Sequence, residues 1–124
     1  MALTILVVDD SALIVRSVTT ILSMNGYKTE SADDGETALA MLKAGLKPNL
    51  MITDINMPIM NGVELIKQTR MLPAFRFMPI LVMTTESQQT LRDEAKALGA
   101  TGWVVKPVGG ELLITIIKKL LPGA

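Results

Sequence analysis

Apolar residues along this chain fall into short continuous runs that alternate with longer segments of helical period. Four runs have the length of a strand and are rich in Val, Ile, Leu and Met; they cover residues 5–8, 50–53, 79–84 and 103–105. Continuous apolar runs, rather than alternating ones, are typical of parallel strands that helices cover on both faces. A weaker, more alternating run at 27–31 is predicted as a strand at the edge of the sheet.

Helix signals lie between the predicted strands. Polar or glycine residues mark where the first four helices begin: Ser11, Asp33 or Asp34, Gly62 and Ser87. Glycines mark where three of these helices end: Gly26, Gly45 and Gly99. The last helix is expected to dock on the sheet through six apolar residues: Leu112, Leu113, Ile116, Ile117, Leu120 and Leu121. Residues 70–78 are predicted to form a loop that packs its own side chains.

The regular alternation of strands and helices predicts an α/β protein with a doubly wound, five-stranded parallel sheet. The chain has 124 residues, which is the length of one domain, so residues 1–124 are expected to form a single unit. A hydrophobic content of 49% is sufficient for a substantial core.

The composition narrows the classes of partner and chemistry. The charges of twelve basic and twelve acidic residues cancel. Proteins that bind nucleic acids or membrane surfaces usually carry an excess of basic residues, so we expect neither kind of partner. The sequence contains no Cys, which excludes thiolate metal sites, and no His, which excludes the commonest general base. It shows neither a signal peptide nor an apolar stretch long enough to span a membrane, so we expect a cytoplasmic protein.

Polar residues whose side chains can bind ligands or take part in catalysis lie at the ends of four of the predicted strands. Asp9 and Asp10 come after the first strand, Asp54 after the third, Thr84 ends the fourth and Lys106 follows the fifth. Taken singly, each has an ordinary structural explanation, such as a helix cap, a turn residue or a solvated side chain. Ligands of open α/β sheets, however, bind at the carboxyl ends of the strands, where these five side chains are expected to meet.

Three carboxylates at one edge of a sheet repel one another unless a cation lies among them. Lys106 supplies one positive charge, and the remaining acidic charge favours a hard divalent cation. Because the chain lacks His and Cys, Mg²⁺ is preferred over zinc. Mg²⁺ in proteins usually keeps room for phosphate oxygens, so the pattern predicts a magnesium site that holds a phosphoryl group.

A carboxylate can attack phosphorus and form an acyl phosphate. Asp54 is the candidate nucleophile, because it stands alone after the predicted central strand, opposite the acidic pair Asp9 and Asp10. Phosphoryl transfer then needs little beyond positioning and neutralisation of charge. The hydroxyl of Thr84 and the ammonium of Lys106 can each hold one phosphoryl oxygen.

Four motifs in this order closely resemble receiver domains of two-component response regulators. They are V-V-D-D-S at 7–11, I-T-D-I-N-M-P-I-M-N-G at 52–62, L-V-M-T-T-E at 81–86 and G-A-T-G-W-V-V-K-P at 99–107. The resemblance extends over residues 4–121. It implies a flavodoxin-like (CheY-like) fold with the strand order 2-1-3-4-5.

The resemblance also assigns roles to the residues at the strand ends. It implies that Asp54 accepts a phosphoryl group from a histidine kinase. Mg²⁺ would be bound by Asp10 directly, by Asp9 through water, by Asp54, and by the backbone carbonyl of Asn56. The switch hydroxyl would belong to Thr84, the phosphate-binding ammonium to Lys106 and the rotameric switch aromatic to Trp103. The Lys106–Pro107 peptide bond matches one that is typically cis in the family.

The sequence departs from the family pattern at a few positions. Trp103 stands where Tyr or Phe is usual, and Asn61 where Asp is common. Val108 replaces a frequent Phe and is followed by Gly109 and Gly110, which weaken the start of the last helix. Separately, two positions that the family uses to tune phosphate lifetime hold Asn56 and Glu86; an equally good interpretation is that both are solvated loop residues.

Phosphorylation is expected to act as a switch rather than as enzymatic turnover, because the chain would catalyse only its own phosphorylation and dephosphorylation. Thr84 would move towards the phosphoryl group and Trp103 would turn inward. This changes the surface formed by the fourth helix, fifth strand and fifth helix, where a target protein binds.

The chain stops at 121–124, directly after the last predicted helix. With this length, the motifs look most like stand-alone chemotaxis regulators of the CheY type, which bind the flagellar motor switch, and a monomer is expected. The alternatives are a phosphorelay intermediate and a receiver excised from a larger regulator, for example a transcriptional one.

Three other classes fit the sequence less well. A haloacid-dehalogenase-like phosphatase expects an Asp-x-Asp pattern after the first strand, whereas Asp9 and Asp10 are adjacent. A flavodoxin needs a Ser/Thr/Gly-rich phosphate loop at the same place, and D-D-S-A is acidic. A degenerate receiver that serves only for docking would have lost Asp54 or Lys106, and both are present.

Overall fold

A five-stranded sheet forms the centre of the protein, and its strands run in the order β2-β1-β3-β4-β5. The computed structural model describes residues 3–121. All neighbouring strands are parallel; their bounds are β1 Thr4–Val8, β2 Lys28–Ala32, β3 Leu50–Thr53, β4 Ile80–Thr84 and β5 Gly102–Val105. The doubly wound parallel sheet expected from the sequence is confirmed, with β2 at one edge.

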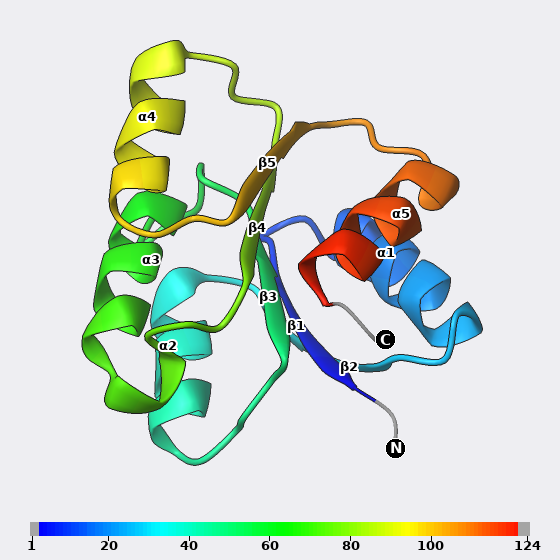
Figure 1. Ribbon diagram of the computed structural model, residues 1–124, viewed down its shortest axis with the longest axis horizontal. Helices are drawn as coiled ribbons and strands as arrows, with labels where there is room; N and C mark the ends of the chain where they lie inside the picture. The colour runs from blue at the N-terminus through cyan, green and yellow to red at the C-terminus, as the bar shows by residue number, and fades with distance from the viewer. Residues whose placement is uncertain (1–2, 122–124) are drawn as a thin grey trace.

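Helices cover both faces of this sheet. Their bounds are α1 Ala12–Met24, α2 Gly35–Lys43, α3 Gly62–Met71, α4 Gln89–Ala97 and α5 Gly110–Leu120, with a short 3-10 helix at Pro73–Phe75. Figure 1 shows α2, α3 and α4 on one side of the strands and α1 and α5 on the other. Within residues 3–121, no helix is both long enough and apolar enough to cross a membrane.

The two helical layers enclose two separate cores, one on each face of the sheet. Along β1, Leu6 and Val8 belong to the core under α2, α3 and α4. Ile5 and Val7 alternate with them and belong to the core under α1 and α5. All four are at most 1% exposed, which explains why the strand is an unbroken apolar run: the two-residue period of a strand places apolar side chains on both faces.

Capping residues fix where several helices begin. The Ser11 hydroxyl accepts a hydrogen bond from the backbone N–H of Ile14 (3.3 Å), as the sequence predicted. Of the two candidates for the second cap, Asp34 is the one that accepts from Thr37 N–H (2.7 Å). These polar groups satisfy backbone donors that a helix terminus otherwise leaves unpaired.

One sequence expectation about an apolar residue is wrong, and one about a loop is correct only in part. Leu112 was expected to dock on the sheet, but it is 55% exposed, whereas Leu113 and Ile117 of the same helix are buried. Residues 70–78 are more regular than expected, because α3 continues to Met71 and the 3-10 helix follows. Phe75 packs inside, but Phe77 is 90% exposed. The expected end of the chain at 122–124 lies outside the described residues.

The start of α3 packs directly against the backbone that follows β3. The N–H of Gly62 donates to the carbonyl of Ile55 (2.9 Å). A Cβ atom at Gly62 would overlap the carbonyl oxygen of Asp54, so only glycine allows this approach without a shift of the main chain. The backbone of Asp54 is therefore held in place by the absence of a side chain at Gly62.

We predict that Gly62→Ala lowers the free energy of unfolding by about 2–3 kcal/mol, because the added methyl group forces the Asp54 peptide to move. Gly109→Ala is the matched control: a Cβ there has nothing within 4 Å, and φ of −68° suits alanine. Gly109 is the N-cap residue of α5, where Ala is less favourable than Gly, so the control should lose about 1 kcal/mol or less. Urea unfolding of the three proteins measures both values, and equal effects of the two substitutions would contradict the prediction.

Candidate functional site

One ammonium group joins the carboxyl ends of three strands. Lys106, which follows β5, places its Nζ atom 2.6 Å from Oδ2 of Asp9 and 2.8 Å from Oδ2 of Asp54. Asp9 follows β1 and Asp54 follows β3, so the sheet brings together residues that lie 97 and 52 positions from Lys106. Both carboxylates are buried, with 2% of Asp9 and 8% of Asp54 exposed.

Backbone amides orient the two buried carboxylates. Oδ1 of Asp54 accepts from the N–H of Ile55 (2.6 Å), and the N–H of Asn56 donates to the same atom at 3.4 Å. Oδ1 of Asp9 accepts from the N–H of Ser11 (3.0 Å). Each carboxylate therefore has one oxygen fixed by the main chain and the other shared with Lys106, which leaves little rotational freedom.

Asp10 completes an acidic cluster with these two residues. Asp10 itself is exposed, yet one carboxylate oxygen from each of Asp9, Asp10 and Asp54 lies within 4.8 Å of the others. All the donors are oxygen atoms, and two of the three carboxylates are buried and oriented. This donor set fits a hard divalent cation of the Mg²⁺ or Ca²⁺ kind better than a soft one.

Burial and hydrogen bonding act in opposite directions on the pKa of Asp54. Burial raises this pKa, but the hydrogen bond from Lys106, the Thr84 hydroxyl, the charge of Lys106 and the Ile55 N–H together hold it below its ordinary value of 3.8. For Lys106, burial lowers the pKa, whereas the bonds and charges of Asp54 and Asp9 raise it above 10.5. Both groups are therefore ionised at neutral pH.

Thr84 is fully buried at the end of β4. Its Oγ1 atom accepts a hydrogen bond from the N–H of Glu86 (3.1 Å). Oε1 of Glu86 in turn accepts from the N–H of Gln88 (3.2 Å), which is the N-cap residue of α4. Glu86 is thus a half-buried residue of the β4–α4 loop whose side chain is bonded to the loop backbone, while its effect on phosphate lifetime stays a prediction.

The remaining predicted residues lie around this cluster. Trp103 is half-buried on β5 and packs against the core under α2, α3 and α4, so it is not part of the charged cluster. Asn56 is exposed and faces Asp54 through its backbone N–H. The Lys106–Pro107 bond is cis, as expected. The orienting amides of Ser11 and Ile55 could not be predicted from residue types, because every residue type except proline carries an amide N–H.

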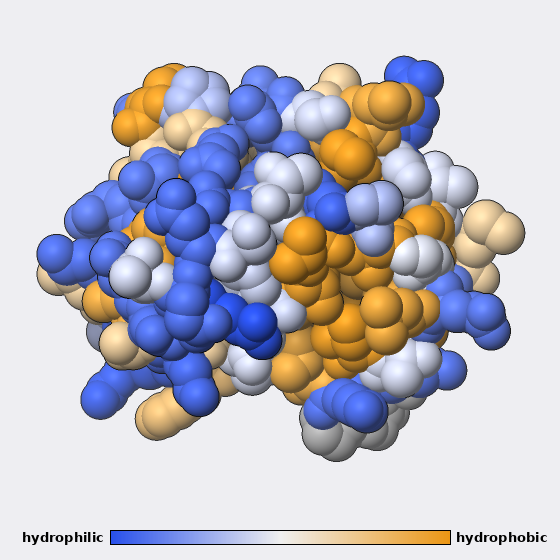
Figure 2. All heavy atoms as spheres, turned by 90° about the horizontal axis from the view of Figure 1, so that it is seen from above, coloured by the Kyte–Doolittle hydropathy of each residue, from blue (hydrophilic) through white to orange (hydrophobic). Residues whose placement is uncertain are grey.

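The surface around the cluster has two different halves. Figure 2 looks onto the carboxyl ends of the strands and shows hydrophilic side chains above α4 and a broad apolar area above α1 and α5. A hollow on the apolar side, about 450 Å³ in volume, has Lys106 and Thr85 among its lining residues, together with apolar ones that include Ile14, Val18 and Val108. The charged cluster is therefore bordered by apolar surface on one side.

A doubly wound sheet with an acidic cluster and a lysine at the ends of β1, β3 and β5 defines a receiver-type signalling domain. The chain belongs to the response regulator receiver domain family, because the model of the family described as "Response regulator receiver domain" matches residues 5–118.

Among curated proteins, the chain is similar to the chemotaxis protein CheY of Pseudomonas aeruginosa, with 37% identity over 117 residues that cover 94% of each chain. It is 40% identical to the chemotaxis protein CheY-3 of Vibrio cholerae over 104 residues, which are 83% of this chain and 79% of that protein. A solved structure of the Vibrio cholerae chemotaxis protein CheY4 superimposes with a TM-score of 0.92 and 40% identity, covering 97% of this chain and 99% of the other. The chain is thus a CheY-like receiver domain.

We predict that Lys106→Met reverses the acid dependence of stability. In the parent, the folded pKa of Asp54 is below 3.8, so its stabilisation is present above that value and is lost as pH falls through the folded pKa. Without Lys106, burial and the Asp9 charge raise the pKa of Asp54 above the unfolded value. The variant should lose about 3 kcal/mol at neutral pH and regain part of it on acidification.

Denaturant unfolding in a chelating buffer, between about pH 7 and about pH 3, measures the sign of this slope. Lys118→Met removes the same charge from an exposed position of α5 and should keep the slope of the parent. A Lys106→Met variant that loses stability with falling pH in parallel with the parent would show that Lys106 does not set the ionisation of Asp54.

Proposed function

We propose that this protein is a phosphorylation switch in which Asp54 accepts a phosphoryl group from the phosphohistidine of a histidine kinase. The observation that carries the proposal is the Lys106 ammonium held between Asp54 and Asp9, next to a third carboxylate. Membership of the receiver family supports the same reading. Asp54 forms an oxygen–phosphorus bond while the phosphorus–nitrogen bond to the donor histidine breaks and the imidazole leaves.

The acidic cluster would hold Mg²⁺ through Asp9, Asp10, Asp54 and the carbonyl of Asn56. When bound, this cation neutralises charge on the transferring phosphoryl group. The rest of the chemistry falls to residues of the chain. Backbone N–H groups of Ile55 and Asn56 fix one oxygen of Asp54, so the carboxylate is oriented before the donor arrives, and Lys106 balances the charge that accumulates beside it.

The switch follows from the position of Thr84. Its hydroxyl is bonded to the N–H of Glu86 in the β4–α4 loop. A phosphoryl group on Asp54 adds roughly one further negative charge and three acceptor oxygens, and the Thr84 hydroxyl can then donate to one of them. That movement removes the acceptor of the Glu86 N–H, and the start of α4 and the packing of Trp103 change with it.

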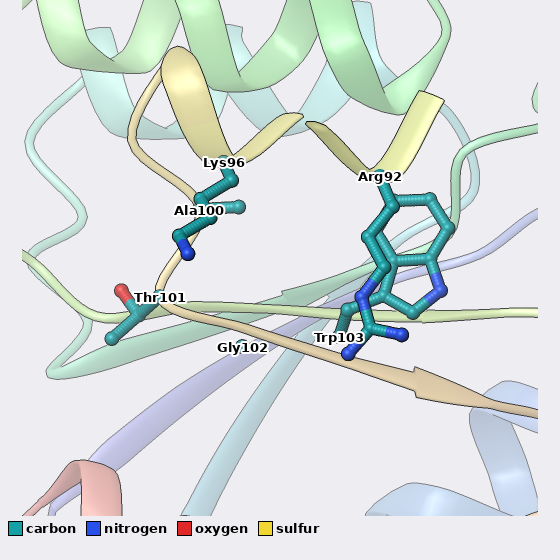
Figure 3. Close-up of a pocket in the computed structure, with 6 residues that line it drawn as sticks. All are labelled: Arg92, Lys96, Ala100, Thr101, Gly102 and Trp103. Atoms are coloured by element: carbon teal, nitrogen blue, oxygen red, sulfur yellow. The ribbon is translucent and has the colours of Figure 1, made fainter. Parts of the chain in front are cut away.

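The target protein would bind the surface formed by α4, β5 and α5. A hollow of about 210 Å³ lies on this surface and is lined by Arg92 and Lys96 of α4, Trp103 of β5, and residues 100–102. Figure 3 shows the two basic side chains and the indole around it. Two cations beside an aromatic ring suit a target segment that carries acidic and apolar residues.

Control of chemotaxis, with the flagellar motor switch as the target, is the output we propose, because the similar proteins are named chemotaxis proteins. A phosphorelay intermediate, or the receiver of a larger regulator, would use the same chemistry at Asp54 and differ only in its partners. In each case the protein acts stoichiometrically and carries one labile phosphate per chain, rather than turning over a substrate.

We predict that a small phosphodonor such as acetyl phosphate, together with Mg²⁺, adds one acid-stable, base-labile phosphoryl group to the chain. Asp54→Asn should abolish the addition, since an amide is not a nucleophile towards phosphorus. Intact-mass spectrometry measures the modification. Trp103, the single tryptophan, should change its emission in parallel, and an unchanged emission at full phosphorylation would contradict the switch while leaving the chemistry intact.

We predict that Asp10→Asn weakens Mg²⁺ binding by roughly tenfold or more, because it removes a charged oxygen ligand. Asp10 is exposed, so the unfolding free energy should stay within about 0.5 kcal/mol of the parent. Isothermal titration calorimetry with MgCl₂ measures the affinity. Asp33→Asn, at another acidic position near the same edge, is the control, and equal losses in both variants would argue against Asp10 as a ligand.

A further inference from the structure

Helix α4 is loosely attached to the rest of the fold. Ala95 is buried, whereas the other residues of α4 are exposed or half-buried. At its N-terminal end, the cap residue Gln88 makes no capping bond through its side chain to the described residues. The bonds that link this end to Thr84 through Glu86 each join residues two positions apart. Leu91 and Ala95 pack on the core, but within the described residues the hydrogen bonds at the N-terminal end are local, so the long-range hydrogen bond next to this helix lies at its C-terminal end.

Arg70 makes that connection. It lies in the last turn of α3, and its guanidinium donates from Nη2 to the carbonyl of Gly99 (2.6 Å), 29 residues away, and from Nη1 to the carbonyl of Phe75 (2.7 Å). Gly99 lies between α4 and β5, and Phe75 ends the 3-10 helix. Hydrogen bonds from an ionised donor are roughly twice as strong as neutral ones, and one planar fork here joins three segments.

Gly99 is adapted to this contact in two ways. Its φ of +113° is a left-handed conformation that glycine adopts without strain. A Cβ atom at this position would also lie 2.7 Å from Nε of Arg70, so the guanidinium occupies the space that a side chain would need. Arg70 and Gly99 therefore form one matched contact at the end of α4.

The residues after Gly99 extend this fixed point to the proposed target surface. The N–H of Thr101 donates to the carbonyl of Ile80 (2.8 Å), and the N–H of Ile80 donates to Oγ1 of Thr101 (3.0 Å). Ala100 and Thr101 line the hollow shown in Figure 3, on the other side of the view from Trp103. The segment at residues 99–101 is thus bonded to the sheet and to Arg70, while the side chains of Arg92, Lys96 and Trp103 form the rest of the lining.

We propose that Arg70 is a positioning residue that anchors the C-terminal end of α4, so that phosphorylation turns this helix about the Arg70–Gly99 contact and reshapes the hollow. The anchor itself follows from the unphosphorylated structure, and its effect on the switch rests on the proposed function. Arg70 lies at the opposite end of α3 from Gly62, which contacts Asp54, so it acts without touching the phosphorylation chemistry.

The first test is amide hydrogen exchange of the unphosphorylated protein, with Arg70→Met compared with Arg76→Met. Methionine keeps an unbranched apolar stem in place of the arginine methylenes and removes the donors, and Arg76 is an arginine that follows the same 3-10 helix. Exchange at Ala100 and Thr101 should accelerate roughly tenfold or more in Arg70→Met and stay unchanged in Arg76→Met. The amide of Asp54, bonded to Val8 in the sheet, should exchange at the parental rate in both variants.

The second test is the Trp103 emission after phosphorylation with acetyl phosphate and Mg²⁺, at equal phosphate content measured by mass. Arg70→Met should take up phosphate at the parental rate but lose half or more of the emission change. Arg70→Lys should fall between the two, because an ammonium cannot bridge both carbonyls as a fork does; it also serves as the test variant if Arg70→Met does not fold.

Accelerated exchange that includes the Asp54 amide would show a loss of global stability and overturn the anchor. So would exchange rates in Arg70→Met that match those of Arg76→Met. Accelerated local exchange with a full Trp103 response would overturn the positioning role. Absence of phosphate on Asp54 in the parent would be a failure of the proposed function, and the exchange data would then decide the anchor by themselves.

Discussion

The contact of the Lys106 ammonium with two buried carboxylates is the constraint on which the rest of this structure depends. Asp9 and Asp54 are like charges that directly follow two adjacent strands, and removing them from water costs several kcal/mol each unless a cation compensates. The cation comes from the far end of the sequence, after β5. The strand order therefore brings Lys106 next to Asp54, and this contact keeps the buried carboxylate ionised.

This constraint also explains why the site is rigid while a neighbouring helix is not. Each oxygen of Asp54 has a bonded partner, either a backbone amide or Lys106, and Gly62 fixes the main chain beneath it. A phosphoryl group added here cannot be accommodated by rotating Asp54 away. Groups that can move must therefore bind the added phosphoryl oxygens. Thr84 is buried beside the site, and its hydroxyl can exchange its hydrogen bond with the N–H of Glu86 for one to a phosphoryl oxygen.

Much of this could be predicted from the sequence, and the failures have physical causes. The strands and the convergence of Asp9, Asp54 and Lys106 follow from continuous apolar runs and from the rule that ligands bind at the carboxyl ends of parallel strands. Leu112 was misassigned because hydrophobicity alone does not say on which side of a helix a residue lies. The anchor formed by Arg70 was invisible, since its acceptors are backbone carbonyls that no residue type encodes.

Asn61 is a residue whose structural role could have been predicted from the sequence. In the sequence it stands out only as an Asn where the family commonly has Asp, yet its side chain accepts from the N–H of Glu64 (2.9 Å) and caps α3. The signal was present, because Asn followed three residues later by Glu is a helix-start pattern. The resemblance to a family motif drew attention to what the position lacked, an aspartate, rather than to what its side chain does for the helix.

The amount of apolar surface that each helix buries determines which helix the proposed switch can displace. Fully burying a Leu or Ile side chain contributes about 1.5–3 kcal/mol, and α5 has Leu113 and Ile117 in the core. Coupling between a modification and a distant surface is typically about 1–3 kcal/mol, which is too little to displace such a helix. Helix α4 buries Ala95 alone among its residues within the described chain. A switch of this energy can therefore move α4 and leave α5 and the sheet where they are.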